Sequence, residues 1–248
     1  MLKYLIEIAT TDFASTEAAI KGGADRIELC SALTDGGLTP SFGLIKRCRE
    51  KFSLPLFPIV RPRSGDFLYN DNEYDIITKE VALCKELGCD GIVIGFLKKD
   101  GSIDKKRTAL VVEAAYPMEV SFHRAFDRSI DPLMAMEEII QTGCQRILTS
   151  GQKSTAVEGV ELIKKLIVEA RDRIIIMPGS GIMKENVASL AEQTGAVEFH
   201  AALRASVNSK MDYIHSSFST QGNYHHPGIM EDEVKALRAE LEKYRSPN

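Results

Sequence analysis

Four stretches of the chain share one pattern of polar and apolar positions: a glycine, a small spacer and then a short apolar run. They read "GGADRIELC", "GCDGIVIGF", "GCQRILTSG" and "GAVEFHAAL". Such a glycine suits the left-handed residue that ends a helix, and the apolar run suits a buried strand. Before three of these glycines, apolar residues recur at helical spacing. With similar runs elsewhere, the pattern predicts eight strands, near residues 4–9, 25–30, 55–61, 90–95, 118–123, 146–150, 173–178 and 196–200.

Helical patterns separate these strands, and successive strands begin about 21 to 35 residues apart, as in βα units. Eight such units in one α/β domain predict a (β/α)8 TIM barrel. The alternative is an open doubly wound sheet, which would usually carry a glycine-rich first turn. The first turn here reads "IATTDFAS", so we favour the barrel.

Helix starts are also marked. Asp131 followed by Pro132 predicts a capped helix with a first-turn proline. The sequence "TAVE" at 155–158 resembles a capping box that opens a helix toward Ala170.

The barrel is expected to span residues 1–203, with residues 204–248 forming an extension on the same domain. Residues 204–228 are polar, and structureless connections of that length are uncommon. The last part predicts an amphipathic helix with one apolar face. In one interpretation, this helix packs on the barrel wall or forms a dimer contact. In the other, the polar segment before it forms a lid. The apolar face consists of Val234, Leu237, Leu241 and Tyr244.

Composition narrows the class of protein. Of the 248 residues, 44% are hydrophobic and 27% are charged, and the formal net charge is −4. This balance lacks the basic footprint of a nucleic-acid-binding protein. No apolar run approaches the roughly 20 residues that cross a membrane, and the N-terminal apolar stretch is too short for a signal peptide. The five cysteines form no CxxC pair, which favours free thiols and a cytoplasmic location.

Ionisable residues gather at the predicted strand ends, where barrel enzymes place their catalytic groups. A carboxylate inside an apolar run is rarely tolerated unless it is paired. These residues therefore either form salt bridges that fill the barrel or converge on a functional site, because buried charges are costly. The catalytic candidates are Glu7, Glu28, Arg61, His123, Arg124 and Asp127.

We expect one connected network around a single pocket, in which both glutamates accept hydrogen bonds from Arg61 and His123 joins them. Two histidines at strand ends, His123 and His200, suit acid–base or metal chemistry. Cys30, at the end of the second strand, is either a small buried hydrophobic residue or a metal ligand.

The loop "MPGSGI" predicts an anion site. Its glycines, Gly179 and Gly181, let the backbone approach a ligand, and a helix is expected to open directly after Ser180. Phosphate sites of barrels often use the loop after the seventh strand. Further candidate ligand-binding residues are Arg63, Ser150, Gly151 and His200.

Other chemistries lack their residues. Apart from Lys3, no lysine falls in the strand segments, so Schiff-base aldolase chemistry has no nucleophile. No GxSxG elbow occurs either. Proton transfer by carboxylate or histidine, or metal-assisted chemistry, remains.

Several motifs together resemble the CutC family of copper-homeostasis proteins: "GADRIELCSALTDGGLTPSFGL", "RPRSGDFLY", "GFLKKDGSID", "FHRAFD", "ILTSG" and "MPGSGI". The resemblance implies a cytosolic TIM barrel, a homodimer, and a role in copper tolerance and copper binding. Cys30 matches the cysteine of the family's "ELC" motif, whereas the positions after the first-strand glutamate that carry cysteine in some relatives are Ala9 and Thr10.

By this resemblance, the candidate copper ligands are Cys30, His123 and His200. The residues themselves leave two alternatives open. The first is an enzyme that acts on a small phosphorylated or carboxylated metabolite by acid–base or metal-assisted chemistry. The second is a non-catalytic scaffold. The expected partners are thus a metal ion, a small anionic molecule or both, with neither nucleic acid nor membrane.

Overall fold

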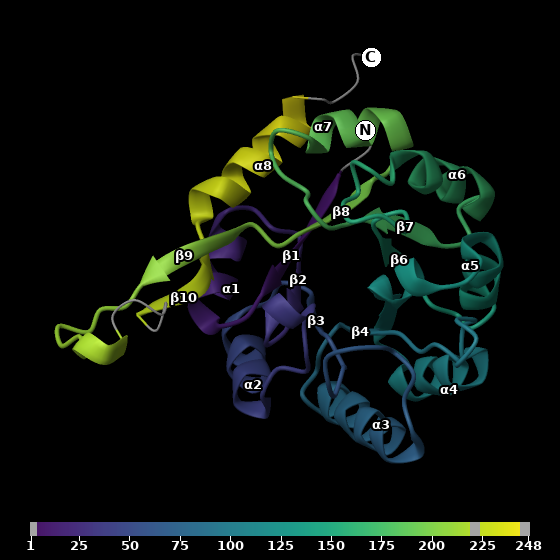
Figure 1. The fold of residues 1–248 in the computed structure, drawn as a ribbon, viewed down its shortest axis with the longest axis horizontal. Helices are drawn as coiled ribbons and strands as arrows, with labels where there is room; N and C mark the ends of the chain where they lie inside the picture. The colour runs from purple at the N-terminus through teal and green to yellow at the C-terminus, as the bar shows by residue number, and fades with distance from the viewer. Residues whose placement is uncertain (1–3, 219–223, 244–248) are drawn as a thin grey trace.

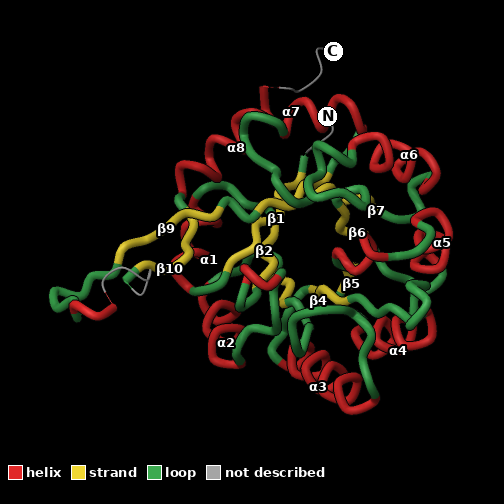
Figure 2. The backbone as a smooth tube through the Cα atoms, in the orientation of Figure 1, coloured by secondary structure: helices red, strands yellow, loops and turns green. Residues whose placement is uncertain are grey.

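The structure, a computed structural model, describes residues 4–218 and 224–243. Eight short parallel strands surround a common axis, and helices lie outside them (Figures 1 and 2). All eight strands fall where the sequence predicted them. The strands are β1 (Leu5–Thr10), β2 (Arg26–Leu29), β3 (Leu56–Pro58), β4 (Gly91–Ile94), β5 (Glu119–Phe122), β6 (Arg146–Thr149), β7 (Ile175–Pro178) and β8 (Glu198–Ala201).

The strands form two four-stranded parallel sheets, in the orders β3-β2-β1-β8 and β4-β5-β6-β7. The amide of Val60 donates to the carbonyl of Val93 at 2.8 Å and connects the first sheet to the second, while β7 and β8 lie side by side. This arrangement confirms the predicted (β/α)8 barrel-type fold.

A helix follows each strand and covers the outside of the barrel, so that outward-facing apolar side chains form the main core between strands and helices. The helices are α1 (Phe13–Lys21), α2 (Phe42–Lys51), α3 (Asp71–Glu86), α4 (Lys105–Ala115), α5 (Pro132–Ile140), α6 (Val160–Ala170), α7 (Val187–Thr194) and α8 (Glu231–Lys243). The short 3-10 helices are η1 (Leu33–Asp35), η2 (Arg124–Arg128) and η3 (Ser216–Phe218). Across the described ranges, no helix is both long and apolar enough to cross a membrane.

One predicted helix start is confirmed and one is wrong. The Asp131 carboxylate accepts from the first amides of α5, with Pro132 at its start. The capping box at 155–158 does not open α6. The Thr155 hydroxyl accepts from the Glu158 amide at 3.3 Å, but this bond closes a turn, and α6 begins at Val160.

The region 204–228, predicted to be a polar connection, contains an antiparallel hairpin. Its strands β9 (Arg204–Asn208) and β10 (His225–Ile229) project away from the barrel (Figure 1). The sequence missed them because each strand is short and mostly exposed, with little apolar alternation to report it.

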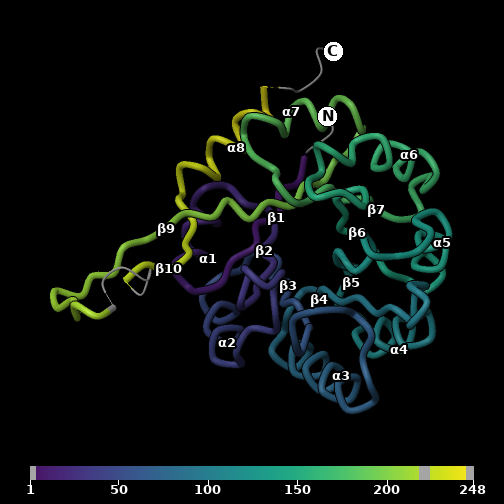
Figure 3. Tube along the Cα trace, in the orientation of Figure 1, coloured from purple at the N-terminus to yellow at the C-terminus, as the bar shows by residue number. Residues whose placement is uncertain are grey.

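Helix α8 completes the outer layer between α7 and α1, beside the N-terminal part of the chain (Figure 3). Its predicted apolar residues Val234, Leu237 and Leu241 are buried, whereas Tyr244 lies outside the described residues. The approach is close at Gly22, where an added Cβ would lie 2.4 Å from Val234 Cβ. Arg238 also donates to the carbonyl oxygen of Gly23 at 2.8 Å, so α8 packs as the eighth barrel helix.

Candidate functional site

The interior of the barrel is polar, which is unusual because barrels mostly fill it with branched apolar side chains. Alternate residues of a strand face the same side. In β2, Arg26 and Glu28 are both buried, and in β8, Glu198 and His200 are both buried. Register places Glu7 of β1 beside Arg26 on one side and His200 on the other.

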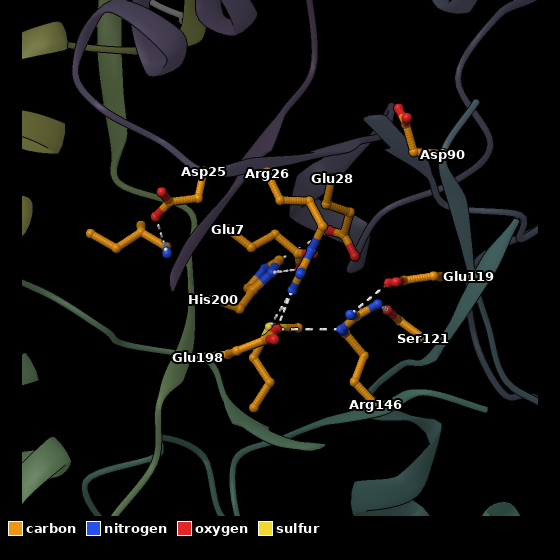
Figure 4. Close-up of polar contacts among 12 residues, drawn as sticks. Glu7, Asp25, Arg26, Glu28, Asp90, Glu119, Ser121, Arg146, Glu198 and His200 are labelled. Atoms are coloured by element: carbon orange, nitrogen blue, oxygen red, sulfur yellow. Dashed lines mark hydrogen bonds and ion pairs between the residues drawn. The ribbon is translucent and has the colours of Figure 1, made fainter. Parts of the chain in front are cut away.

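Five charged side chains form an ion-pair chain across the N-terminal part of the barrel interior (Figure 4). Arg26 Nε donates to Glu7 Oε2 at 2.5 Å, and Arg26 Nη2 donates to Glu198 Oε2 at 2.7 Å. Arg146 continues the chain by donating to Glu198 at 3.3 Å and to Glu119 at 2.7 Å. Both guanidiniums of this ion-pair chain, those of Arg26 and Arg146, thus face carboxylates from neighbouring strands.

Above this chain, Glu7, Glu28 and His200 converge. His200 Nδ1 lies 2.7 Å from Glu7 Oε1, and His200 Nε2 lies 3.8 Å from Glu28 Oε2. One donor atom from each residue lies within 4.8 Å of the others. Glu28 differs from Glu7 because it lacks a hydrogen-bond donor among the described residues.

The three groups have different protonation properties. Burial raises the pKa of Glu7, but the charge of Arg26 and the hydrogen bond to His200 outweigh it, so this pKa lies well below its usual range. Burial lowers the pKa of His200, but the charges of Glu28 and Glu7 outweigh it and raise the pKa. Burial raises the pKa of Glu28 to about 7. Glu7 is therefore a fixed anion, whereas Glu28 exchanges a proton near neutrality.

A cavity of about 550 Å³ opens over this cluster at the C-terminal ends of the strands. Glu28 and His200 lie in its wall together with His123 and Arg61, so these predicted site residues do share one pocket. Cationic side chains outnumber the carboxyl groups of the wall, five to three. The cationic ones are Arg61, Arg124, Arg128, Lys153 and Arg204.

The predicted single network is nevertheless wrong, because Arg61 binds backbone rather than the glutamates. Its Nη1 donates to the carbonyl oxygens of Asp35 at 2.8 Å and Gly37 at 3.0 Å, and its Nη2 donates to that of Gly65 at 3.0 Å. Arg61 therefore fixes the loops that form the pocket rim. The glutamates find their partners in adjacent strands.

His123 begins η2 as its N-terminal cap. Its Nδ1 accepts from the Ala125 amide at 3.1 Å, which leaves the proton of the neutral ring on Nε2. The ring packs against Phe67 with centroids 4.8 Å apart. Burial, with the nearby charge of Arg61, lowers the pKa of His123 to about 3. With this low pKa, His123 is neutral and poorly suited to accept a proton, and its Nε2 has no hydrogen-bond partner within the described chain.

Asp127 organises the loop after β6. It accepts from the hydroxyl of Thr149 and from the amides of Ser150 and Gln152, both at 3.1 Å. Arg124 Nε donates to it at 2.7 Å. Asp127 thus orders the rim and holds Arg124, while His123 takes its orientation from the backbone of η2.

Four predicted ligand residues lie outside the cavity wall: Arg63, Ser150, Gly151 and Gly179. Arg63 pairs with Glu73 of α3 at 2.5 Å. The Ser150 side chain is buried against the Asp127 loop, and the Gly151 amide donates to the Thr149 hydroxyl at 2.9 Å.

The loop after β7 reaches the rim, but no helix opens directly behind it, because α7 begins only at Val187. Position 179 has room only for glycine, because an added Cβ would lie 2.4 Å from the side chain of Leu148. Ser180 and Gly181 have positive φ and line the cavity. Within the described residues, the amides of Ser180, Gly181 and Ile182 donate to no protein acceptor.

Arg26 and Arg146 were missed by examining strand ends alone. Both stand at the first position of their strands, below the mouth. Alternation would have found Arg26, because it is two residues before Glu28 and therefore faces the same side.

A family model described as the CutC family matches residues 4–205. The chain belongs to the CutC family. A CutC family protein of Chromobacterium violaceum is 42% identical over 96% of this chain and 98% of its own. The human copper homeostasis protein cutC homolog is 44% identical over 86% of this chain and 78% of its own.

A solved structure agrees with the CutC assignment. The copper homeostasis protein CutC from Streptococcus agalactiae superposes with a TM-score of 0.76 and 30% identity, covering 80% of this chain and 98% of its own. Thiamine phosphate pyrophosphorylase from Pyrococcus furiosus superposes with a TM-score of 0.61 at 14% identity, covering 99% of this chain and 98% of its own, and shows the fold alone.

The three copper ligands expected for a CutC protein are not brought together. Of Cys30, His123 and His200, only His200 belongs to the cluster of converging donor atoms. The Cys30 thiol donates to the Thr10 carbonyl at 3.4 Å, and burial, with the charge of Glu28, raises its pKa far above the usual range. The oxygen and imidazole donors at this mouth fit a divalent ion such as Cu(II) better than thiophilic Cu(I).

Proposed function

We propose that the chain takes part in copper homeostasis by binding a divalent metal ion, Cu(II) foremost, at Glu7, Glu28 and His200. The observation that carries this proposal is the convergence of three buried donor groups within 4.8 Å at the base of an open cavity. We choose copper as the metal because the human and mouse relatives are named copper homeostasis proteins.

Charge balance supports a dication there. Three buried carboxylates (Glu7, Glu28, Glu198) and the half-exposed Glu119 lie around two buried guanidiniums (Arg26, Arg146). Two negative charges are left over. They are neutralised either by protons on His200 and Glu28 or by one divalent ion, so protons and metal compete for the same site.

Titration calorimetry with Cu(II), and with Zn(II) as a redox-inert probe, tests the site. We expect one ion per chain, and Glu28→Gln or His200→Gln to weaken binding by roughly 10- to 100-fold, as loss of a metal-site partner does. His226→Gln, on the exposed hairpin, is the matched control. Equal affinity of wild type and Glu28→Gln would remove Glu28 as a ligand. Because the pKa of Glu28 is about 7, affinity should fall as the pH drops below neutrality.

A second candidate function is binding of a small phosphorylated or carboxylated molecule in the cavity above the cluster, as a substrate of metal-assisted or acid–base chemistry. The cationic wall favours it, and so do the unpaired amides of Ser180, Gly181 and Ile182, which point to a bound anion.

Phosphate should therefore raise the melting temperature more than chloride at equal ionic strength, because a ligand selective for the folded state stabilises it. Ser180→Asp adds a negative charge at the rim, at a positive φ that aspartate tolerates. We expect it to abolish the phosphate-specific part of the shift. Ser189→Asp, on the exposed side of α7, carries the same charge change and should keep it. If the phosphate-specific shift is unchanged in Ser180→Asp, the anion binds elsewhere. If the wild type binds neither metal nor anion, the result favours a non-catalytic scaffold.

We also propose a cytoplasmic location and a homodimer. All five cysteines are free, which suits a reducing compartment. The hairpin arm exposes Met211, Tyr213 and Ile214, and contact with a second copy would bury them.

A further inference from the structure

Arg61 is a buried cation without a carboxylate partner. Three arginines of the described chain are buried: Arg26, Arg61 and Arg146. Arg26 and Arg146 each form salt bridges to two carboxylates, whereas Arg61 forms none in the part of the chain that the structure describes. Buried charges are usually paired, because removing a charge from water is costly. The unpaired charge of Arg61 therefore points to an anion that the chain itself does not supply.

Backbone carbonyl groups hold the Arg61 guanidinium in place without neutralising it. The carbonyl oxygens of Asp35, Gly37 and Gly65 accept from its two terminal nitrogens. Gly37 and Gly65 have positive φ, of 86° and 89°, which glycine adopts without strain. Since a carbonyl group has no net charge, these bonds orient the side chain and leave its charge in place. The two loops thus fix a cation in the wall of the cavity.

A second guanidinium lies beside Arg61 at the rim. Arg128 Nη1 donates at 3.1 Å to the carbonyl oxygen of Gly65, which also accepts from Arg61 Nη2. The two guanidiniums lie over the ring of Phe67, 4.8 Å (Arg61) and 5.1 Å (Arg128) from its centroid. Arg128 is exposed, and it too forms no salt bridge among the described residues. Two like charges this close repel each other, so an anion that contacts both is favoured.

His123 adds a neutral donor beside the two cations. Its ring lies 4.8 Å from the same Phe67 ring, and it belongs to the cavity wall. Burial lowers the pKa of His123, and the charges of Arg61 and Arg128 act in the same direction. The proton of the neutral ring is on Nε2, which is buried and has no hydrogen-bond partner in the described chain. An oxygen of a bound anion would supply the missing acceptor.

The loop after β7 lies across the mouth from Arg61. The strands β3 and β7 are four positions apart in a ring of eight, so the loops that follow them face each other over the cavity (Figure 1). The amides of Ser180, Gly181 and Ile182 in the second loop are also without protein acceptors among the described residues. The cavity thus has unused donors on two opposite sides. A ligand that uses both sets carries two anionic groups.

We propose that Arg61, Arg128 and His123 bind the carboxylate of a small phosphorylated acid whose phosphate lies at the loop after β7. A guanidinium matches a carboxylate in shape and forms charge-assisted hydrogen bonds with it, whereas consecutive backbone amides suit a phosphate. The inference rests on the second candidate function, because the phosphate end is the anion proposed there. It adds the carboxylate subsite and, with it, the class of ligand.

Three compounds with one carbon skeleton test the two ends separately. 3-Phosphoglycerate has a phosphate and a carboxylate, glycerol 3-phosphate has only the phosphate, and glycerate has only the carboxylate. Titration calorimetry uses the full chain after EDTA treatment and desalting, because a metal ion at Glu28 and His200 would also attract a carboxylate. We expect the wild type to bind 3-phosphoglycerate about tenfold or more tightly than glycerol 3-phosphate, since hydrogen bonds to a charged group add to affinity.

Variants locate the carboxylate. Arg61→Gln should weaken binding of 3-phosphoglycerate by about 10- to 100-fold and leave the affinity for glycerol 3-phosphate unchanged. Because Arg61 also holds the rim loops, Arg128→Gln and His123→Asn repeat the test without removing it. Each should weaken binding of 3-phosphoglycerate by about 3- to 10-fold. Arg47→Gln, which removes an exposed arginine from the ring of Phe13 outside the cavity, is the matched control and should change neither affinity.

The outcomes separate this inference from the function on which it rests. Equal affinities of the wild type for 3-phosphoglycerate and glycerol 3-phosphate would overturn the carboxylate subsite and leave the phosphate site standing. A preference for 3-phosphoglycerate that persists in Arg128→Gln and His123→Asn would also overturn it, because the carboxylate would then bind elsewhere. If neither phosphorylated compound binds the wild type, the phosphate site fails, and the proposed class of ligand fails with it.

Discussion

Replacing Arg26 by methionine should lower the free energy of unfolding by about 3–5 kcal/mol, the usual cost of removing one partner from a buried ion pair. Arg26 is the only guanidinium that the described structure places against both Glu7 and Glu198. Methionine fills similar space, but it leaves the Glu7 carboxylate, which is fully buried, without its cation. Urea unfolding monitored by circular dichroism measures the change.

Two comparisons isolate the electrostatic cause. Arg173→Met removes an arginine that pairs with Glu137 on the surface, and it should cost far less than Arg26→Met, because solvent screens an exposed ion pair. Arg26→Met combined with Glu7→Gln should recover part of the loss, because the unpaired charge is removed together with its partner. If Arg26→Met costs no more than Arg173→Met, the interior ion-pair chain does not hold the barrel together.

Two local signals agree at four of the eight strands, and the other four were found from the apolar run alone. At those four, a glycine ends the preceding helix, and at all eight the run is apolar on its outward face, since helices cover every strand. The hairpin of β9 and β10 has neither signal. Its residues are mostly exposed, so no apolar alternation marks them.

The sequence predicted several residues of the site, but it missed Arg26 and Arg146 and did not predict how the charged groups pair. Reading strand ends found Glu28, His123 and His200, which do share one cavity. The partner of Glu7 depends on sheet register, which places Arg26 opposite it, and sequence alone does not reveal register between strands 19 residues apart. Arg61 was predicted to pair with the glutamates because opposite charges attract, whereas its guanidinium donates to backbone carbonyl oxygens of two loops.

His123 should make the protein lose stability in acid. Its folded-state pKa of about 3 lies below the ordinary value of 6.5, so between these values the unfolded chain binds a proton that the folded chain does not. Stability is therefore full above about pH 6.5 and declines as the pH falls toward 3. Glu28 acts oppositely, since its raised pKa of about 7 makes the folded chain bind the extra proton between pH 7 and 4.5. The two effects partly cancel in the wild type, and a variant is needed to separate them.

His123→Asn is that variant, because asparagine is a strong helix cap whose side-chain oxygen can replace Nδ1 as acceptor for the Ala125 amide, and it does not titrate. Between pH 7 and 4.5 we expect its free energy of unfolding to rise relative to the wild type by about 2–3 kcal/mol, from two pH units of linkage below 6.5. The neighbouring charges of Arg61 and Arg128 are present in both proteins and leave the comparison intact. His226→Asn, on the exposed hairpin, should track the wild type at every pH. A constant difference between wild type and His123→Asn across this range would mean that His123 is protonated in the folded protein, and the mouth would then contain a cation where the structure places a neutral hydrogen-bond donor.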